Sequence, residues 1–188
     1  AGFWFLAGDG VTGPSADREA YADIVPRTAP LARFEGNAAH SNQFANLAFD
    51  GHADPDTLAF VESEYRPERT PVIRDFTSSK SLDRGIWIRA GAMDLHDVKA
   101  ADNARATFFS YNQTLHDSLI VGRSANTGTP DTPREIAAGR TLPEPYEGRY
   151  FRGHSIYDGP SGVIDTHFAN FTREDAAIQT QGAAQKSP

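Results

Sequence analysis

A short phrase, in which an apolar residue is followed two positions later by aspartate, recurs along the chain. It occurs in Ile73-Arg74-Asp75, Leu95-His96-Asp97 and Leu115-His116-Asp117, so the apolar residue returns after 22 and then 20 residues. Residues 163–168 keep the apolar residue but shift the aspartate, and residues 32–37 look like an earlier copy. A unit of about 20 residues cannot enclose a core alone, so it has to stack on its neighbours.

Second short strands separate these phrases and follow small or polar turns. They are expected at 47–49, 85–88 and 104–109. No long stretch has the 3.6-residue periodicity of a helix, and only 17–24 and 134–138 suggest helical turns. The pattern predicts an all-β chain folded as a right-handed parallel β-helix with loop excursions. Leucine-rich repeats share the period but need a fixed Asn/Cys and L-x-L spacing that is missing, and a β-sandwich is the remaining alternative.

We expect one domain over residues 1–179, followed by a small, polar, flexible tail at 180–188. Two segments rich in proline or charge, about 52–70 and 126–150, interrupt the repeat and predict excursions from the scaffold. Long excursions from a rigid scaffold often carry binding groups. The first residues, 2–6, resemble a strand entered in mid-domain, so we expect a fragment or a processed chain.

Composition removes several classes of function. Cysteine is absent, which excludes disulfides, Cys-ligated zinc and Cys nucleophiles. The net charge of −7 argues against nucleic-acid binding, which requires a basic face. No apolar run reaches the length of a membrane span, and no signal peptide is visible.

Among the cations only Lys80, Lys99 and Lys186 are lysine, so arginine is the main cation. Arginine pairs bidentately with carboxylates such as those of uronic acids, although a genomic preference for arginine codons gives the same composition.

Several stretches, taken in order, resemble the central β-helix region of the cell migration-inducing and hyaluronan-binding protein family, which includes the cell-surface hyaluronidase. The stretches are Gly2-Phe3-Trp4-Phe5, Thr12-Gly13-Pro14-Ser15, Asn37-Ala38-Ala39-His40-Ser41-Asn42, residues 72–76, 80–89 and 101–103, residues 118–126, 139–143 and 156–160. The resemblance implies a secreted or cell-surface protein that binds an anionic polysaccharide of the hyaluronan type. It also implies neighbouring domains in the same protein. Val98 and Thr166 replace cysteines of the family, which fits a bacterial relative.

Two aspartates are candidates for catalysis. Aligning the coils on the turn before the second strand places Asn46, Gly85 and Ala104 in register, and thereby Asp83 and Asp102 at equivalent positions of adjacent coils. Carboxylates on neighbouring strands, ~4.8 Å apart, suit a retaining glycosidase pair. The same spacing suits a shared Ca²⁺, and turn aspartates also simply hydrogen-bond their own backbone. All three interpretations stay open.

Histidine and lysine add to this candidate site. His40 and Lys80 fall close to the same stack of turns, where a histidine can act as general base in a uronide lyase and a cation can neutralise the acid group. The alternative for His40 is a turn residue that caps a backbone carbonyl. His96 and His116 recur at the same place in two coils and predict a stacked, outward-facing structural pair.

The substrate-binding candidates are Arg74, Lys80, Arg84, Trp87 and Arg89. Trp87 can stack on a sugar ring while arginines hold carboxylates. In Ile86-Trp87-Ile88, alternation puts the indole on the face opposite to the isoleucines, so it is either exposed or itself core.

Three functions follow: a glycan-binding β-helix domain, a polysaccharide-degrading hydrolase or lyase, or a structural segment of a large surface protein. Binding is the leading hypothesis, and enzyme activity stays open. A phosphate loop, a His-x-x-x-His metal pair on a helix and a serine-esterase elbow are all missing, so phosphoryl transfer, zinc hydrolysis and serine-esterase chemistry are not expected.

Overall fold

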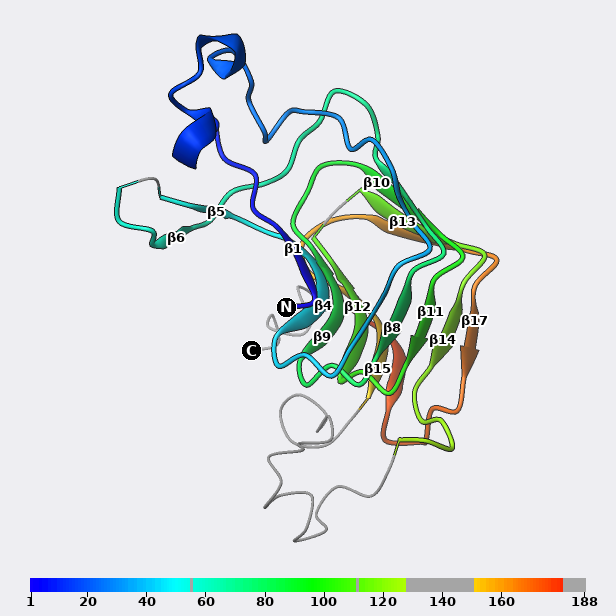
Figure 1. Ribbon diagram of the computed structural model, residues 1–188. Coiled ribbons are helices and arrows are strands. Elements are labelled where there is room, and N and C mark those ends of the chain that lie inside the picture. Colours follow the sequence, from blue (N-terminus) through cyan, green and yellow to red (C-terminus); the bar gives the residue numbers. More distant parts are fainter. Residues whose placement is uncertain (55, 111, 128–150, 181–188) are drawn as a thin grey trace, which may run out of the picture.

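The computed structural model describes residues 1–54, 56–110, 112–127 and 151–180 (Figure 1). Most of these residues belong to three sheets of parallel strands. Sheet A contains β1 (Phe3–Phe5), β4 (Ala45–Phe49), β9 (Arg84–Ile88), β12 (Arg105–Phe109), β15 (Arg152–Ile156) and β18 (Ala176–Thr180). Sheet B contains β2 (Phe34–Glu35), β7 (Val72–Arg74), β10 (Met93–His96), β13 (Gln113–His116) and β16 (Ser161–Ile164). Sheet C contains β3 (Ala38–His40), β8 (Thr77–Ser79), β11 (Lys99–Ala101), β14 (Leu119–Val121) and β17 (His167–Ala169).

The chain visits sheets B, C and A in turn and then begins the next coil, so equivalent strands stack on one another (Figure 1). Helical structure in the described residues is limited to two short 3₁₀ turns, Gly13–Ser15 and Glu19–Tyr21. The second of these lies inside the helical turn expected at 17–24. The all-β prediction is therefore confirmed, and the three stacked parallel sheets are consistent with a β-helix. None of the described helices has the length and apolar character needed to cross a membrane.

The recurring phrase marks the corner between sheets B and C. Its apolar residue faces the core, as Ile73 and Leu95 do, and its aspartate adopts a positive φ in the turn. This left-handed conformation is tolerated best by Gly, Asn and Asp, which explains why every residue at this corner is Gly or Asp. The corner residues are Gly36, Asp75, Asp97, Asp117 and Asp165. Since Val163 pairs with Leu115, Asp165 falls in register, and the shift expected for that copy was wrong.

The interior is mainly apolar, and one of its buried polar clusters is centred on Asn103. Each strand of sheet A directs alternate side chains inward, so Phe49, Ile88 and Phe109 stack in register inside the coils. Asn103 is almost fully buried beneath this stack, and it joins side chains from three coils. Its oxygen accepts a hydrogen bond from the Ser81 backbone N–H at 2.9 Å, and its amide donates to the Ser78 carbonyl at 3.1 Å.

The segment expected to leave the scaffold at 52–70 contains an antiparallel pair, β5 (His52–Ala53) and β6 (Phe60–Val61), between β4 and β7. In Figure 1 this pair projects from the side of the stacked sheets near β1. Most of the second expected excursion, and nearly all of the expected tail, lie outside the described residues. The register of sheet A and the position of β6 together define the site described next.

Candidate functional site

A groove of about 520 Å³ runs along the outer face of sheet A, beside the projecting β5–β6 pair. Aromatic and charged side chains line it almost exclusively. They are Trp4, Phe44, Asp50, Phe60, Glu62, Arg84, Trp87, Arg89, Phe108 and Tyr157. The groove thus combines flat apolar surfaces with both signs of charge, which is the composition of a site for a polar ligand with flat faces.

Strand alternation creates the floor of this groove. Because Ile86 and Ile88 point into the core, Trp87 has to point outward, as the sequence pattern indicated. Sheet register then aligns Trp4 on β1, Ala48 on β4 and Trp87 on β9 in one row, which continues to Phe108 on β12. The small Ala48 side chain between the two tryptophans is fully buried, and Phe44 packs against this part of the row.

Trp87 faces outward and is nevertheless only 2% exposed. Its indole N–H donates to Asp50 Oδ2 at 2.7 Å, its ring lies 4.7 Å from that of Phe108, and Tyr157 meets it edge-on. The residues that offer exposed rings to a ligand are instead Trp4 and Tyr157, at 45% and 39% exposure. The sequence left open whether Trp87 is exposed or part of the core. It lies outside the main core and is covered by groove residues.

Arg84 lies against the aromatic floor. Its guanidinium carbon is 4.9 Å from the ring centres of both Phe44 and Trp87, which are cation–π distances. Its Nε atom lies 3.3 Å from Asp83 Oδ2. Burial raises the pKa of the Asp83 carboxyl, and the positive charges of Arg84 and Arg105 only partly offset this effect. Asp83 is thus a carboxyl group of raised pKa that contacts the groove residue Arg84.

Arg89 connects the sheet to the excursion. Its Nε atom lies 3.2 Å from Asp50 Oδ1, and its Nη1 atom lies 2.8 Å from Glu62 Oε2. Burial is the strongest single influence on the Arg89 pKa and lowers it. The hydrogen bond to Glu62 and the charges of Asp50 and Glu62 together outweigh burial, so the pKa is raised. Arg89 is therefore a firmly charged residue that holds two carboxylates at one end of the groove.

The expected equivalence of Asp83 and Asp102 was wrong. Sheet C pairs Ala101 with Ser79, so Asp102 takes the place of Lys80 in the next coil, at a corner of positive φ. In sheet A, Gly85 aligns with Ala106 and not with Ala104, because Arg84 pairs with Arg105. The expected alignment matched the turns that precede the second strands, and the pairing in sheet A differs from it by two residues. The positive φ at the corner before these strands had no signal in the sequence.

Asp102 has a well-defined set of partners. Its Oδ1 accepts the Ser124 backbone N–H at 2.7 Å, its Oδ2 accepts the Ser124 hydroxyl at 2.6 Å, and Thr127 also donates to Oδ1. The carboxylate thereby organises the start of the segment after β14. These partners lie 22 and 25 residues further along the chain, so they differ from the local backbone hydrogen bond of the third interpretation.

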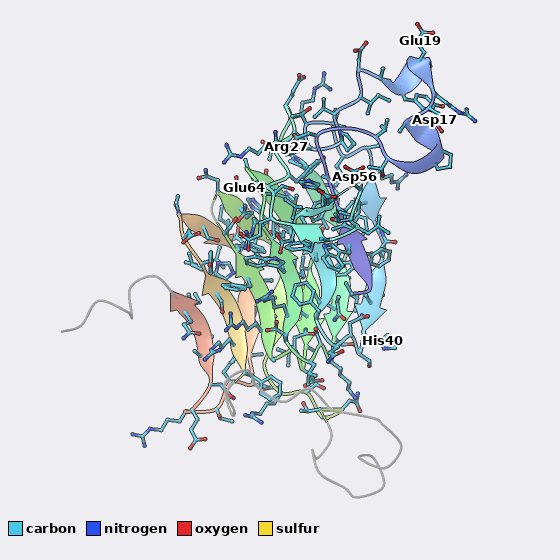
Figure 2. The ribbon with its side chains drawn as sticks, turned by 90° about the vertical axis from the view of Figure 1, so that its left-hand side faces the viewer. Asp17, Glu19, Arg27, His40, Asp56 and Glu64 are labelled. Atoms are coloured by element: carbon cyan, nitrogen blue, oxygen red, sulfur yellow. The ribbon has the colours of Figure 1, made fainter. Side chains whose placement is uncertain are left out.

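The other predicted residues lie around the scaffold. Arg74 is exposed on the outer face of sheet B, away from the groove. Lys80 follows β8 in the same corner stack as Asp102, and His40 ends β3 one position before that stack, as expected. Figure 2 shows His40 projecting at the opposite end of the molecule from Arg27 and Glu64. Of the predicted binding residues, the structure brings together Arg84, Trp87 and Arg89 in the groove.

Sequence reasoning missed most of the groove. Trp4, Phe44 and Phe108 come from strands or corners whose alternation was not followed outward. Phe60 and Glu62 come from the excursion, for which only a general binding role was expected. The alternation in residues 104–109, which places Phe108 opposite to Phe109, was the one usable signal.

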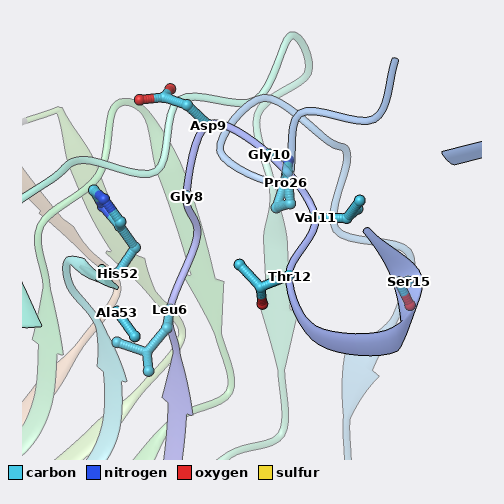
Figure 3. A pocket seen from close by; sticks show the side chains of 10 residues that line it. All are labelled: Leu6, Gly8, Asp9, Gly10, Val11, Thr12, Ser15, Pro26, His52 and Ala53. Carbon is cyan, nitrogen blue, oxygen red and sulfur yellow. The ribbon is translucent and has the colours of Figure 1, made fainter. Parts of the chain in front are cut away.

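A second hollow, of about 470 Å³, lies between the first loop and β5 (Figure 3). It is lined mainly by small or aliphatic residues. Its two titratable side chains have partners elsewhere: Asp9 pairs with Arg27, and His52 hydrogen-bonds Ser63 at 3.1 Å. This hollow has no exposed aromatic ring, so the groove on sheet A is the stronger candidate for ligand binding.

Comparison with known proteins places this scaffold among its relatives. The chain is 31% identical over 207 residues to cell migration-inducing and hyaluronan-binding protein of Mus musculus, a match that covers 90% of the chain and 15% of that protein. The Homo sapiens protein of the same name is 30% identical with the same coverage. Cell surface hyaluronidase of Danio rerio is 27% identical over 200 residues, covering 92% of the chain and 14% of that protein.

No family model matches the chain. The chain spans about 15% of the length of the curated relatives it matches, and the similarity extends over nearly all of its own length. The chain therefore belongs to the family that includes cell migration-inducing and hyaluronan-binding protein and cell surface hyaluronidase.

Proposed function

We propose that this chain is a right-handed β-helix domain of a secreted or cell-surface protein and that its sheet A groove binds an anionic polysaccharide of the hyaluronan class. The observation that carries the proposal is the row of aromatic rings with two arginines on one face of the solenoid. The names of the relatives, which specify hyaluronan, support the choice of ligand. The right hand is supported by the strong preference of crossovers between parallel strands for that hand.

The groove offers complementary contacts to each part of such a polymer. Exposed faces of Trp4 and Tyr157 suit the apolar faces of pyranose rings. Arg84 and Arg89 are partly exposed and can each form a charge-assisted pair with a uronate carboxylate. Asp50 and Glu62 can accept hydrogen bonds from sugar hydroxyls. Neighbouring domains of the intact protein would extend the surface along the polymer.

Truncation of the exposed rings tests the groove. We expect Trp4→Ala and Tyr157→Ala each to weaken the binding of a hyaluronan oligosaccharide of defined length about tenfold, since a stacked ring contributes on the order of 1 kcal/mol beyond simple burial. Isothermal titration calorimetry measures the affinity. Leu58→Ala is the matched control, because Leu58 is 78% exposed on the excursion and does not line the groove.

The charge requirement is tested with the same protein and a second ligand. A neutral dextran of equal length should bind far more weakly than the hyaluronan oligosaccharide, and added salt should weaken only the latter. Equal affinity for the two polymers would contradict the charge requirement. Wild-type affinity in both Trp4→Ala and Tyr157→Ala would show that the oligosaccharide binds outside the groove. Absence of binding to either polymer would favour the architectural role.

Depolymerisation is the second candidate function, and the raised pKa of Asp83 behind Arg84 favours it. Glycoside cleavage requires a general acid, and burial shifts the pKa of the Asp83 carboxyl in the direction that this role needs. Asp102 and His40 are the partner residues predicted from the sequence, and Ca²⁺ held by Asp83 or Asp102 is the cofactor proposed for this activity.

Size analysis of high-molecular-weight hyaluronan tests this second function, with reducing-end release measured in parallel and with or without Ca²⁺. Wild-type chain should shorten the polymer, and Asp83→Asn combined with Asp102→Asn should reduce the rate at least a hundredfold. Asp97→Asn is the control, since it changes an exposed corner aspartate that asparagine can replace at positive φ. Unchanged polymer length with the wild type would leave binding as the function.

A further inference from the structure

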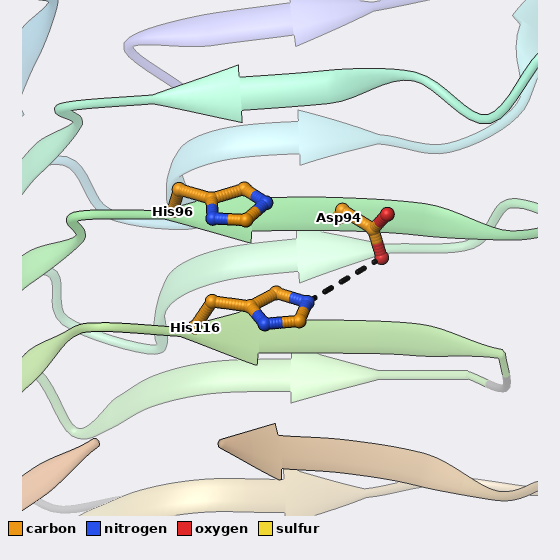
Figure 4. Close-up of side chains that lie close together, drawn as sticks. All are labelled: Asp94, His96 and His116. Atoms are coloured by element: carbon orange, nitrogen blue, oxygen red, sulfur yellow. Dashed lines mark ion pairs between the residues drawn. The ribbon is translucent and has the colours of Figure 1, made fainter. Parts of the chain in front are cut away.

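Two histidines and an aspartate converge on the outer face of sheet B (Figure 4). Strands β10 and β13 pair in parallel with His96 opposite His116. Because Met93 and Leu95 point into the core, Asp94 and His96 on the same strand have to point outward. The same alternation on β13 directs His116 outward. The cluster therefore follows from the register and the alternation of two ordinary strands.

The geometry of the cluster is well suited to an ion. The imidazole rings stack with centres 4.4 Å apart and planes 5° apart, so their equivalent nitrogens point the same way. One ligand atom from each of the three residues lies within 4.8 Å of the other two. Asp94 Oδ1 is 3.7 Å from His116 Nε2, and Figure 4 shows the carboxylate facing the ring edges of both histidines.

A fourth residue lies beside one of the ligands, at an ion-pair distance that is longer than a hydrogen bond. Asp117 Oδ2 lies 3.8 Å from Nδ1 of His96, on the ring atom opposite to Nε2. A carboxylate next to the second nitrogen of a metal-bound histidine commonly fixes the tautomer in which the first nitrogen is free to bind. The residues that flank the cluster in register are Arg74 on β7 and Ile164 on β16. Neither of them supplies another ligand, so remaining coordination positions face solvent.

We propose that Asp94, His96 and His116 form a binding site for a divalent transition ion of the Zn²⁺ class. Two imidazoles and one carboxylate are a common ligand set for Zn²⁺, whereas Ca²⁺ and Mg²⁺ prefer oxygen alone. Two nitrogens bound tetrahedrally to one zinc lie about 3.4 Å apart, given Zn–N bonds near 2.05 Å. To reach that distance the two rings would have to tilt toward one another from their parallel stack, and both side chains, 23% and 21% exposed, border solvent.

Such an ion would connect two successive coils, because its ligands come from β10 and β13. Binding to the folded chain and not to the unfolded one stabilises the fold by mass action. The site lies on sheet B and the groove on sheet A, so the ion would act on the scaffold independently of the glycan. The proposed function of the groove and this site can therefore succeed or fail separately.

The test uses the untagged chain and Zn²⁺ in competition with a chromophoric chelator. We expect one ion per chain, and a loss of affinity of at least tenfold in each of His96→Gln, His116→Gln and Asp94→Asn. His167→Gln is the matched control, because His167 is an exposed, outward histidine on sheet C. Its affinity for Zn²⁺ should equal that of the wild type. Binding that persists unchanged in the His96→Gln/His116→Gln double variant would overturn the proposal, as would the absence of binding at micromolar Zn²⁺.

Two further readouts do not depend on the competition assay. Co²⁺ bound to the wild-type chain should give the intense visible absorption of a tetrahedral site, and the double variant should lack it. Zn²⁺ at about a hundredfold excess over its Kd should raise the thermal midpoint by roughly 5 to 10 °C in the wild type and in His167→Gln. An equal rise in the double variant would show binding elsewhere. Circular dichroism without metal confirms that each variant folds.

Discussion

Asn103→Ala is expected to lower the free energy of unfolding by about 3 to 5 kcal/mol, because it removes the partner of several buried polar groups at once. The Ser81 backbone N–H, the Ser78 carbonyl and the Asn46 amide all hydrogen-bond this side chain. An unsatisfied buried group costs about 1 to 3 kcal/mol, and alanine cannot replace any of these bonds. Denaturation by guanidinium with linear extrapolation measures the change.

Asn37→Ala is the control for this prediction. Asn37 makes one exposed hydrogen bond to its neighbour Glu35, so its replacement should change the unfolding free energy by less than about 1 kcal/mol. If Asn103→Ala were as mild as this control, water would have to satisfy the groups left behind, and the polar cluster would not be a determinant of stability. A changed m-value would instead indicate that the coils unfold separately.

Acidification is expected to destabilise the protein through His154. This side chain is fully buried, between the Thr107 hydroxyl at 2.8 Å from Nδ1 and the Ser161 hydroxyl at 2.9 Å from Nε2. Burial lowers the pKa of the imidazole from 6.5 to about 4. Between these two values the unfolded chain binds a proton that the folded chain does not. The unfolding free energy therefore falls as the pH drops from about 6.5 to about 4, by roughly 3 kcal/mol.

His154→Gln should remove this pH dependence, because glutamine does not titrate. The difference in unfolding free energy between wild type and variant, measured by urea denaturation at several pH values, should change by roughly 3 kcal/mol over that range and level off above it. Taking the difference subtracts the opposite contribution of Asp83, whose raised pKa favours the folded chain at low pH. His167→Gln, at an exposed histidine, should retain the wild-type profile. A profile for His154→Gln that runs parallel to the wild type would show that the imidazole has the same pKa in the folded and unfolded chains, against this prediction.

The fold was predictable from the sequence because its main determinant is local and repeated. The corner aspartates and the apolar residues two positions before them mark each coil, and Ile73, Leu95 and Leu115 indeed lie at paired positions. The corner between sheets C and A was not predictable in the same way. Ser41, Lys80, Asp102 and Asn170 all adopt positive φ there, and no shared chemistry reveals it. The error of register at Asp102 came from this corner.

The site was only partly predictable for a related reason. Arg84, Trp87 and Arg89 are close in sequence, so one strand with its alternation brings them to one face. Trp4 and Tyr157 reach the same groove from distant parts of the chain, through pairings of sheet A that no local pattern encodes. Asp50 and Glu62 depend on the path of the excursion, which only the folded chain defines.

The row on sheet A also sets a length scale. Trp4 and Trp87 occupy equivalent positions on β1 and β9, with Ala48 of β4 between them. Neighbouring strands are about 4.8 Å apart, so the two indoles are offset by roughly 9.6 Å along the solenoid. Trp87 itself is covered, so a chain molecule in the groove can contact the exposed ring of Trp4 and, beyond Trp87, the exposed ring of Tyr157, which meets the Trp87 indole edge-on. Under the proposed function, the strand spacing would fix the interval between the ring faces that a polymer can reach, and so select polymers by their repeat length as well as by their charge.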